Sequence, residues 1–379
     1  MPNEMTREIY KDIITPFLDR RDSETWHDRA RNALHLAEAT SFTLKLLEQF
    51  TYQRERFTDQ RLRIVLGGVE FDNPLVVGAG WDKAGKSVRG LYTLGFFVEV
   101  GSVLAYPQEG NPKPRQFVLA PGVVLNRLGF NSPGMEAVAK NLERYRESGI
   151  PIGISLGKNK DVEPKDAPEA HAVVAKRLYH DAAYFVINVS SPNTPGLREL
   201  QDKAPLTDIV QAVNGAMDEM GGRKPTFVKI APDLTNEAVN DVIEVVAVNG
   251  LTGIIATNTT VRADLKAQYG EKWRNEAGGL SGDNEEFRRM ANEKIAHIYR
   301  ETGGRMEIVG IGGVKDVETA LEKIRAGARV VQVVTAIRGE GTTLPGRINR
   351  GLVEWMDREG VGNISEVVGI DNSSNGVSR

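Results

Sequence analysis

Short apolar runs alternate with helix-length segments along most of the chain. The apolar runs predict eight β-strands, at Leu75–Ala79, Phe97–Ser102, Pro151–Leu156, Tyr184–Val189, Thr226–Ala231, Gly253–Thr257, Glu307–Ile311 and Val330–Thr335. Segments between them have the apolar period of helices, for example Ala167–Tyr179, Asn236–Val248, Asn284–Thr302 and Val317–Ala326. Repeated β-α units predict an α/β fold, namely a (β/α)8 TIM barrel, with a doubly wound open sheet as the alternative.

Residues 1–61 show helical periodicity and no strand pattern. Their apolar residues form three stripes: Ile9, Ile13, Ile14, Phe17 and Leu18; then Trp26, Ala30, Ala33, Leu34 and Ala37, after a candidate N-cap at Ser23; then Phe42, Leu46 and Phe50. We expect an N-terminal helical cap at 1–61, a barrel at 62–370 that begins with a hairpin around Gly67-Gly68, and a flexible tail at 371–379. The cap either packs on the barrel or contacts lipid or an apolar substrate, and the pattern alone favours packing.

The composition excludes several classes of function. The chain has 379 residues, a formal net charge of −3 and no cysteine. Disulfides, thiolate metal sites, iron–sulfur clusters and cysteine nucleophiles are therefore excluded, and the charge provides no basic field for nucleic acid. The five histidines lack metal-ligand spacing, so we expect no metal site. We also expect no membrane-spanning segment and no signal or transit peptide.

Amides and lysines are frequent where the predicted strands end. In a TIM barrel the reactive groups lie at the C-terminal ends of the strands. Asparagines follow the fourth and sixth strands and a loop after the second, and lysines accompany the first and fifth. Asparagine suits a flat ligand with alternating C=O and N–H edges, although it also caps turns. Lysine suits anions or electron-rich heteroatoms.

The last two strands predict a phosphate site. Gly312-Gly313 ends the seventh strand and Asp316 starts a helix. Paired glycines let backbone N–H groups approach an anion, and the loops after strands seven and eight commonly bind phosphate in this fold. We therefore expect a phosphate-bearing cofactor or substrate.

Residues Gly80–Ser87, GWDKAGKS, match the P-loop pattern and follow an apolar strand. A P-loop requires an open sheet and a second strand that ends in a magnesium-binding Asp. No other predicted strand ends that way, because Asp233 follows Pro232 in a loop. We interpret the match as coincidental.

Nine segments resemble, in order, the dihydroorotate dehydrogenases, in particular the quinone-dependent class 2. They are AGWDKAGK (79–86), GSVLAYPQEGNPKPR (101–115), NRLGFNSPG (126–134), LGKNK (156–160), NVSSPNTPGLREL (188–200), VKIAPDL (228–234), ATNTT (256–260), GGLSG (278–282) and EKIRAGARVVQ (322–332). The resemblance covers nearly the whole chain and is weakest over residues 1–60.

The resemblance implies a cofactor, FMN, and a set of residues for each ligand. Ser191 would be the catalytic base. The substrate would contact Lys83, Asn126, Arg127, Leu128, Gly129, Phe130, Asn188, Asn193, Asn258 and Thr259. FMN would contact Ala79, Gly80, Trp81, Asp82, Lys83, Ser102, Ser155, Asn188, Lys229, Thr257, Ser281, Gly282, Gly312, Gly313, Val334 and Thr335, the last four around its phosphate.

The resemblance also implies a reaction and partners. Dihydroorotate is oxidised to orotate as a base takes a proton from C5 and a hydride leaves C6 for FMN. Class 1 enzymes use a cysteine base, so a chain without cysteine fits the serine class; Thr194 or a water is a candidate proton relay. Ubiquinone or menaquinone would accept the electrons under the N-terminal cap. We expect a monomer, peripherally attached through its N-terminal helices to the cytoplasmic face of a bacterial inner membrane.

Five departures from the family pattern stand out, one of which is an N-terminal segment that is longer and more polar than the resemblance leads us to expect. Ser155 replaces an asparagine that touches FMN, and Val334 replaces a tyrosine. GGLSGDNEEFRRM lacks the usual Pro-Leu, and IRGEGTTLPG replaces an aromatic-rich segment. Three alternatives stay open: a related FMN enzyme with another pyrimidine or acceptor, a non-redox barrel enzyme with a phosphorylated substrate, and a binding module.

Overall fold

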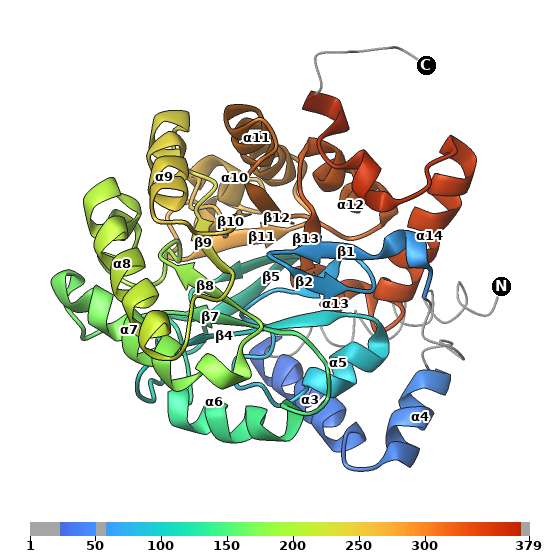
Figure 1. Cartoon of the computed structure of the whole chain (residues 1–379), viewed down its shortest axis with the longest axis horizontal. Coiled ribbons are helices and arrows are strands. Elements are labelled where there is room, and N and C mark those ends of the chain that lie inside the picture. The colour runs from blue at the N-terminus through green and yellow to red at the C-terminus, as the bar shows by residue number, and fades with distance from the viewer. Residues whose placement is uncertain (1–22, 51–57, 373–379) are drawn as a thin grey trace.

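Eight parallel strands close into a barrel. In barrel order they are β3 (Leu75–Val77), β4 (Phe97–Val103), β7 (Ile152–Leu156), β8 (Tyr184–Asn188), β9 (Thr226–Ile230), β10 (Gly253–Ala256), β12 (Glu307–Ile311) and β13 (Val330–Val333). Pairing of β13 with β3 closes the ring. The computed structural model describes residues 23–50 and 58–372. Figure 1 shows the helices arranged around the strands.

The helices of the barrel follow the strands along the chain. They are α5 (Val88–Leu94), α6 (Met135–Leu142), α7 (Ala167–Arg177), α8 (Lys203–Glu219), α9 (Asn236–Val248), α10 (Ala263–Ala267), α11 (Glu285–Thr302), α12 (Val317–Ala326), α13 (Thr335–Glu340) and α14 (Leu344–Glu359). Side-chain caps fix several starts: Thr235 caps α9, Asn284 caps α11, and Asp316 forms a capping box with Thr319 at α12.

The predicted TIM barrel is confirmed, and the open sheet is excluded by the closed strand order. The strands are buried and mostly apolar because both of their faces are covered, one by the barrel interior and one by helices. Boundaries differ by one or two residues. The first strand ends two residues early, at Val77. The eighth strand also ends two residues early, at Val333, because Val334 leaves the extended conformation (φ −134°, ψ −70°) and Thr335 begins α13.

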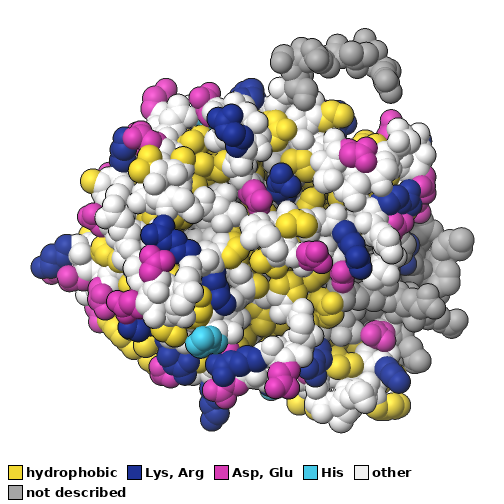
Figure 2. Space-filling model, viewed as in Figure 1, with side chains coloured by type: hydrophobic (Ala, Val, Ile, Leu, Met, Phe, Trp, Pro, Cys, Tyr) yellow, Lys and Arg dark blue, Asp and Glu magenta, His cyan; other side chains and the backbone are white. Residues whose placement is uncertain are grey.

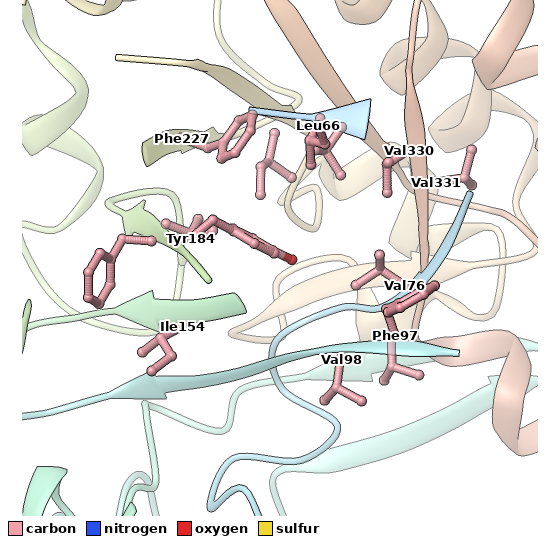
Figure 3. Packing of buried hydrophobic residues seen from close by; sticks show 14 of the residues in the cluster. Leu66, Val76, Phe97, Val98, Ile154, Tyr184, Phe227, Val330 and Val331 are labelled. Carbon is pink, nitrogen blue, oxygen red and sulfur yellow. The ribbon is translucent and has the colours of Figure 1, made fainter. Parts of the chain in front are cut away.

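The predicted hairpin at Gly67-Gly68 is confirmed and covers the N-terminal end of the barrel. It pairs β1 (Ile64–Leu66) with β2 (Val69–Phe71). Both turn glycines have positive φ, 58° and 79°, which the tight primed turns of hairpins require. The Phe71 ring packs edge-on against Phe97 at 4.8 Å. Figure 3 shows Leu66 beside the side chains of the barrel strands that form this end of the core.

An antiparallel sheet that the sequence pattern did not predict stands at the other end. It consists of β5 (Gln116–Ala120), β6 (Val123–Asn126) and β11 (Gly279–Gly282), in the order β11-β6-β5. β6 comes from the excursion after β4 and β11 from the excursion after β10. Their pairing places Asn126 opposite Gly279. Two loops that are distant in sequence are therefore held together beside the barrel mouth.

Helices α3 (Ser23–Ala37) and α4 (Ser41–Phe50) form the described part of the N-terminal cap. The first predicted stripe, Ile9 to Leu18, lies outside the described residues. The hydroxyl of Ser23 accepts hydrogen bonds from Gln116 Nε2 (2.8 Å) and Arg338 Nη1 (2.6 Å). Ser23, predicted as the N-cap, is the first described residue of α3, and its hydroxyl fastens the helix to the barrel.

In the cap, α3 packs against α5 of the barrel and against β5, and α4 packs against α5, yet part of the apolar surface of the cap is exposed. Leu36 is 69% exposed and Phe42 is 73% exposed. Figure 2 shows hydrophobic side chains at the lower right edge, where Figure 1 places α4, and elsewhere on this face Lys and Arg lie among Asp and Glu. None of the described helices is long and apolar enough to cross a bilayer.

Candidate active site

A cavity of about 700 Å³ lies at the C-terminal ends of the barrel strands, between the barrel and α3. Most residues that the sequence predicts to bind ligands line it, although they are spread over the length of the chain. They are Ala79, Gly80, Trp81, Lys83, Ser102, Asn126, Leu128, Gly129, Phe130, Asn188, Ser191, Asn193, Lys229, Thr257, Asn258, Thr259, Ser281, Gly282, Gly312, Gly313, Val334 and Thr335. The fold thus brings together amides, hydroxyls and lysines from separate loops.

Three predicted site residues do not line the cavity. The fully buried Asp82 accepts hydrogen bonds from backbone N–H groups four and five residues later, at 3.1 and 2.7 Å. The Arg127 guanidinium pairs with Glu276 and stacks on the Phe117 ring, 5.2 Å from its centroid. Ser155 is fully buried behind the cavity wall. The side chains of Asp82 and Arg127 thus bond within the protein.

A chain of hydrogen bonds fixes two of the cavity asparagines. Asn258 Nδ2 donates to Ser190 Oγ at 3.0 Å, and Ser190 Oγ donates to Asn188 Oδ1 at 3.0 Å. Asn188 Nδ2 donates to Ser102 Oγ at 2.7 Å, and Ser102 Oγ lies 2.9 Å from Ser155 Oγ. Because each amide is held by buried partners, its orientation is set before a ligand binds.

Several polar atoms around Ser191 are left for a ligand. Ser191 Oγ accepts the Asn193 backbone N–H at 3.3 Å, and Asn193 Nδ2 donates to Asn126 Oδ1 at 3.1 Å. Asn193 Oδ1, Thr194 Oγ1 and Thr259 Oγ1 are buried and have no hydrogen-bond partner among the described residues. Unpaired buried polar atoms are costly, and Asn193 and Thr259 line the same cavity as Ser191, which indicates a polar ligand.

Two lysines enter the cavity without a counter-ion in contact. Among the described residues, neither the Lys83 nor the Lys229 ammonium has a hydrogen-bond acceptor or an ion-pair partner, and both line the cavity. Burial lowers the pKa of Lys83 to about 8 and also lowers the pKa of Lys229. In the same barrel interior, burial raises the pKa of Glu99, whose carboxylate accepts a hydrogen bond from Gln332. The two cations favour an anionic or electron-rich ligand.

Glycines shape the wall opposite the asparagines. Gly312 and Gly313 have φ of 118° and 77°, and Gly80 has 106°, conformations that residues with a Cβ rarely adopt. At Gly282 a Cβ would lie 2.0 Å from a backbone oxygen. Ser281 Oγ lies 3.0 Å from Thr335 Oγ1. The wall therefore offers backbone and hydroxyl groups at close range.

Comparison with known proteins decides the family. The family model described as "Dihydroorotate dehydrogenase" matches residues 61–356. The chain belongs to the dihydroorotate dehydrogenase family. The resemblance inferred from the nine segments is thus confirmed.

Curated relatives in this family cover most of the chain. A Rhizobium rhizogenes protein named "Dihydroorotate dehydrogenase (quinone)" is 45% identical over 316 residues, which are 82% of this chain and 85% of that protein. A Natronomonas pharaonis protein of the same name is 40% identical over 365 residues, 95% of this chain and 98% of that protein.

A solved dihydroorotate dehydrogenase structure has the same fold. The crystal structure of DHODH in complex with ferulenol from Eimeria tenella superposes with a TM-score of 0.83 at 32% identity. The match covers 92% of this chain and 96% of that one, so it extends beyond the barrel.

The segment that resembles a P-loop has another use in this dihydroorotate dehydrogenase family member. It leaves β3 of a closed barrel, not an open sheet. Ser87 Oγ donates to the Arg31 carbonyl at 3.0 Å, and His27 Nε2 lies 2.6 Å from the Trp81 carbonyl oxygen. The segment thus contributes Lys83 to the cavity and, through these two hydrogen bonds, attaches α3 to the barrel.

The supporting residues of this dehydrogenase site were not predicted from the sequence. Ser190, Glu99 and Gln332 bond to or lie beside predicted site residues, and Arg198 spans three loops. Glu99 and Gln332 carried a usable signal, because each is a polar residue with a long side chain in a mostly apolar strand. Such a residue in a barrel strand points to the interior.

Proposed function

We propose that the protein oxidises (S)-dihydroorotate to orotate in pyrimidine nucleotide synthesis, with FMN as hydride acceptor and a quinone as final electron acceptor. The observation that carries the proposal is the cavity lined by Ser191, four asparagines and two lysines whose ammonium groups form no hydrogen bond or ion pair among the described residues. The name that the relatives share, dihydroorotate dehydrogenase (quinone), supports the same reaction and acceptor.

The residues present fit FMN. Lys229 offers a buried cation with no acceptor in the described part of the chain, suited to an electron-rich ring edge. The wall of Gly312 and Gly313 leaves the backbone open to a phosphate, and Ser281 and Thr335 add hydroxyls. Ala79, Gly80, Ser102 and Thr257 complete the lining. When bound, FMN supplies the redox chemistry, because it accepts a hydride and passes the electrons on.

The amides hold the pyrimidine. Asn126, Asn188, Asn193 and Asn258 present fixed donors and acceptors to a ring whose edges alternate C=O and N–H, and Thr259 stands beside them. Lys83 binds the substrate carboxylate from the same cavity. Because the four amides are held by protein partners before the substrate arrives, little reorganisation of these amides accompanies binding.

Ser191 takes the proton from C5. Its Oγ is fixed by the Asn193 backbone N–H, which leaves the hydroxyl proton free to move on. The buried Thr194 hydroxyl, with no partner among the described residues, receives that proton directly or through a water and gives up its own proton toward solvent. Serine is a weak base, so this onward transfer is what makes the step possible.

The quinone, ubiquinone or menaquinone, reaches the cavity beneath α3. Trp26, Ala30, Ala33 and Leu34 of α3 line this side of the cavity, together with Leu47 of α4. The exposed Leu36 and Phe42 contact the membrane surface. We propose a monomer, attached peripherally to the cytoplasmic face of a bacterial inner membrane, with residues 1–61 as cap, 62–370 as barrel and 371–379 as tail.

A visible absorption spectrum tests the proposal. The purified protein should be yellow, and anaerobic dihydroorotate should bleach the flavin band. Ubiquinone or menaquinone should then restore the band, while fumarate and NAD should not. A colourless protein that FMN does not reconstitute, or a flavin band that dihydroorotate leaves unchanged, would refute the proposal.

A further inference from the structure

One guanidinium connects three loops at the barrel mouth. Arg198 begins the 3₁₀ turn η6 (Arg198–Gln201), which follows the Ser191 loop. Its Nε donates to the Ser190 carbonyl at 3.1 Å, its Nη2 to the Thr259 carbonyl at 2.8 Å, and its Nη1 to Asp233 Oδ2 at 2.9 Å. These acceptors lie after β8, β10 and β9, respectively.

The acceptors are themselves fixed. Asp233 Oδ1 accepts the Thr260 hydroxyl at 2.5 Å, next to the Thr259 carbonyl that Arg198 binds. Gln201, at the other end of η6, accepts the Ala231 N–H at 2.9 Å and donates to the Arg198 carbonyl at 3.1 Å. The turn that carries Arg198 is therefore anchored to the end of β9.

The two carbonyls that Arg198 binds belong to neighbours of reacting groups. Ser190 precedes Ser191, and Thr259 follows Asn258. The guanidinium therefore sets the distance between the loop that carries the base and the loop that carries a substrate amide. Arg198 and Asp233 do not line the cavity, so they act only through these loops.

We propose that Arg198 is a positioning residue that holds Ser191 at the correct distance from Asn258 for proton removal from the substrate. The inference rests on the function proposed above. A guanidinium is a planar fork with donors in fixed directions, so it can bind all three acceptors at once, whereas an ammonium is a point charge on a flexible stem. Displacement of a reacting group by about 1 Å can lower a rate about 100-fold.

The two half-reactions provide the test. In Arg198→Met we expect FMN content and its reoxidation by a quinone to match the wild type, because neither uses the Ser191 loop. Anaerobic reduction of FMN by dihydroorotate should be about 100-fold slower, with the limiting rate affected more than the substrate concentration at half-saturation. Millimolar methylguanidinium should restore a measurable part of that rate. The flavin of Arg198→Lys should also be reduced slowly by dihydroorotate. This variant is used for the test if Arg198→Met does not fold.

Arg146 provides the matched control. Like Arg198, it forms an ion pair and lies outside the cavity lining, but it bonds to a single group: its Nε and Nη2 donate to the Asp181 carboxylate at 2.6 and 3.2 Å. Arg146→Met should leave the reduction rate unchanged and insensitive to methylguanidinium. Wild-type reduction rates in both Arg198 variants, or equal losses in the two half-reactions, would overturn the inference. If dihydroorotate fails to reduce the wild-type flavin, the proposed function fails first and the inference falls with it.

Discussion

Asn188 Nδ2 donates a 2.7 Å hydrogen bond to Ser102 Oγ, which lies 2.9 Å from Ser155 Oγ. Ser155 stands where the resemblance to class 2 enzymes leads us to expect an asparagine that touches FMN. Here the shorter side chain is fully buried and reaches the cavity only through Ser102. At this position the structure thus shows support for Asn188, an amide that we propose to bind the substrate, through Ser102.

Removal of that support should weaken substrate binding. In Ser155→Ala the Ser102 hydroxyl keeps Asn188 but loses Ser155 as a partner, which costs about 0.5–1.5 kcal/mol, and orotate affinity should fall by roughly two- to tenfold. Isothermal titration with orotate measures this. Ser148→Ala removes a comparable bond, Ser148 Oγ to the Tyr145 carbonyl at 2.6 Å, outside the cavity. Equal orotate affinity in Ser155→Ala and the wild type would contradict the assignment.

Orotate binding should depend on the charge of Lys83. Burial lowers the pKa of this ammonium to about 8. Below that pH the amine is protonated and attracts the orotate carboxylate; above it the charge is lost, so the association constant should fall by up to about tenfold per pH unit. Titrations from pH 7 to 9 test the direction. Lys83→Arg stays charged and should show a flat profile, and a wild-type profile that is equally flat would exclude the role.

Alanine substitutions at two glycines should change the free energy of unfolding in opposite directions. A Cβ at Gly253, in β10, would lie 1.8 Å from the Glu307 carbonyl oxygen of the neighbouring strand. Gly253→Ala should therefore lower the free energy of unfolding by about 1–3 kcal/mol. A Cβ at Gly215, in α8, would meet nothing within 4 Å, and Gly215→Ala should raise stability by about 0.5–1 kcal/mol. Urea unfolding of the two variants in parallel measures both changes, and effects of the same sign would contradict the difference in packing between the two positions.

The exposed residues of the cap should bind membranes. Leu36 and Phe42 are 69% and 73% exposed. The double variant Leu36→Ser, Phe42→Ser should float less with anionic liposomes than the wild type, because apolar burial contributes to interfacial binding. Val248 on α9 is 76% exposed and serves as control, since Val248→Ser should leave flotation unchanged. Removal of residues 1–50 should abolish flotation, and unchanged flotation after this removal would refute the membrane role of the cap.

The barrel was predictable from the sequence because the apolar composition of each strand indicates that the strand is buried. A strand covered on both faces is continuously apolar, and the helices between have a clear period, so β12, α9 and α12 were predicted to the residue. The Gly67-Gly68 hairpin was predictable for a similar local reason, since only glycine adopts its turn freely. The ligand residues came from the family resemblance, and their contacts with FMN and substrate remain predictions.

Pairings between distant segments were not predictable. The β11-β6 pair joins residues about 155 positions apart, and neither strand has a long apolar run. Arg198 looked like an ordinary charged residue of a loop, because its role depends on carbonyls that three different loops bring within reach. For Asp82 and Arg127, the position in a motif led us to expect ligand contact. In the structure their side chains bond to other parts of the protein.

The central claim is that the Ser191 hydroxyl removes the proton while the amides hold the substrate. The most direct measurement is the anaerobic rate of flavin reduction by dihydroorotate in Ser191→Ala. We expect this variant to bind FMN normally and to be reduced about 10²–10⁴-fold more slowly than the wild type, the usual contribution of a positioned base. Reduction at close to the wild-type rate would contradict the claim.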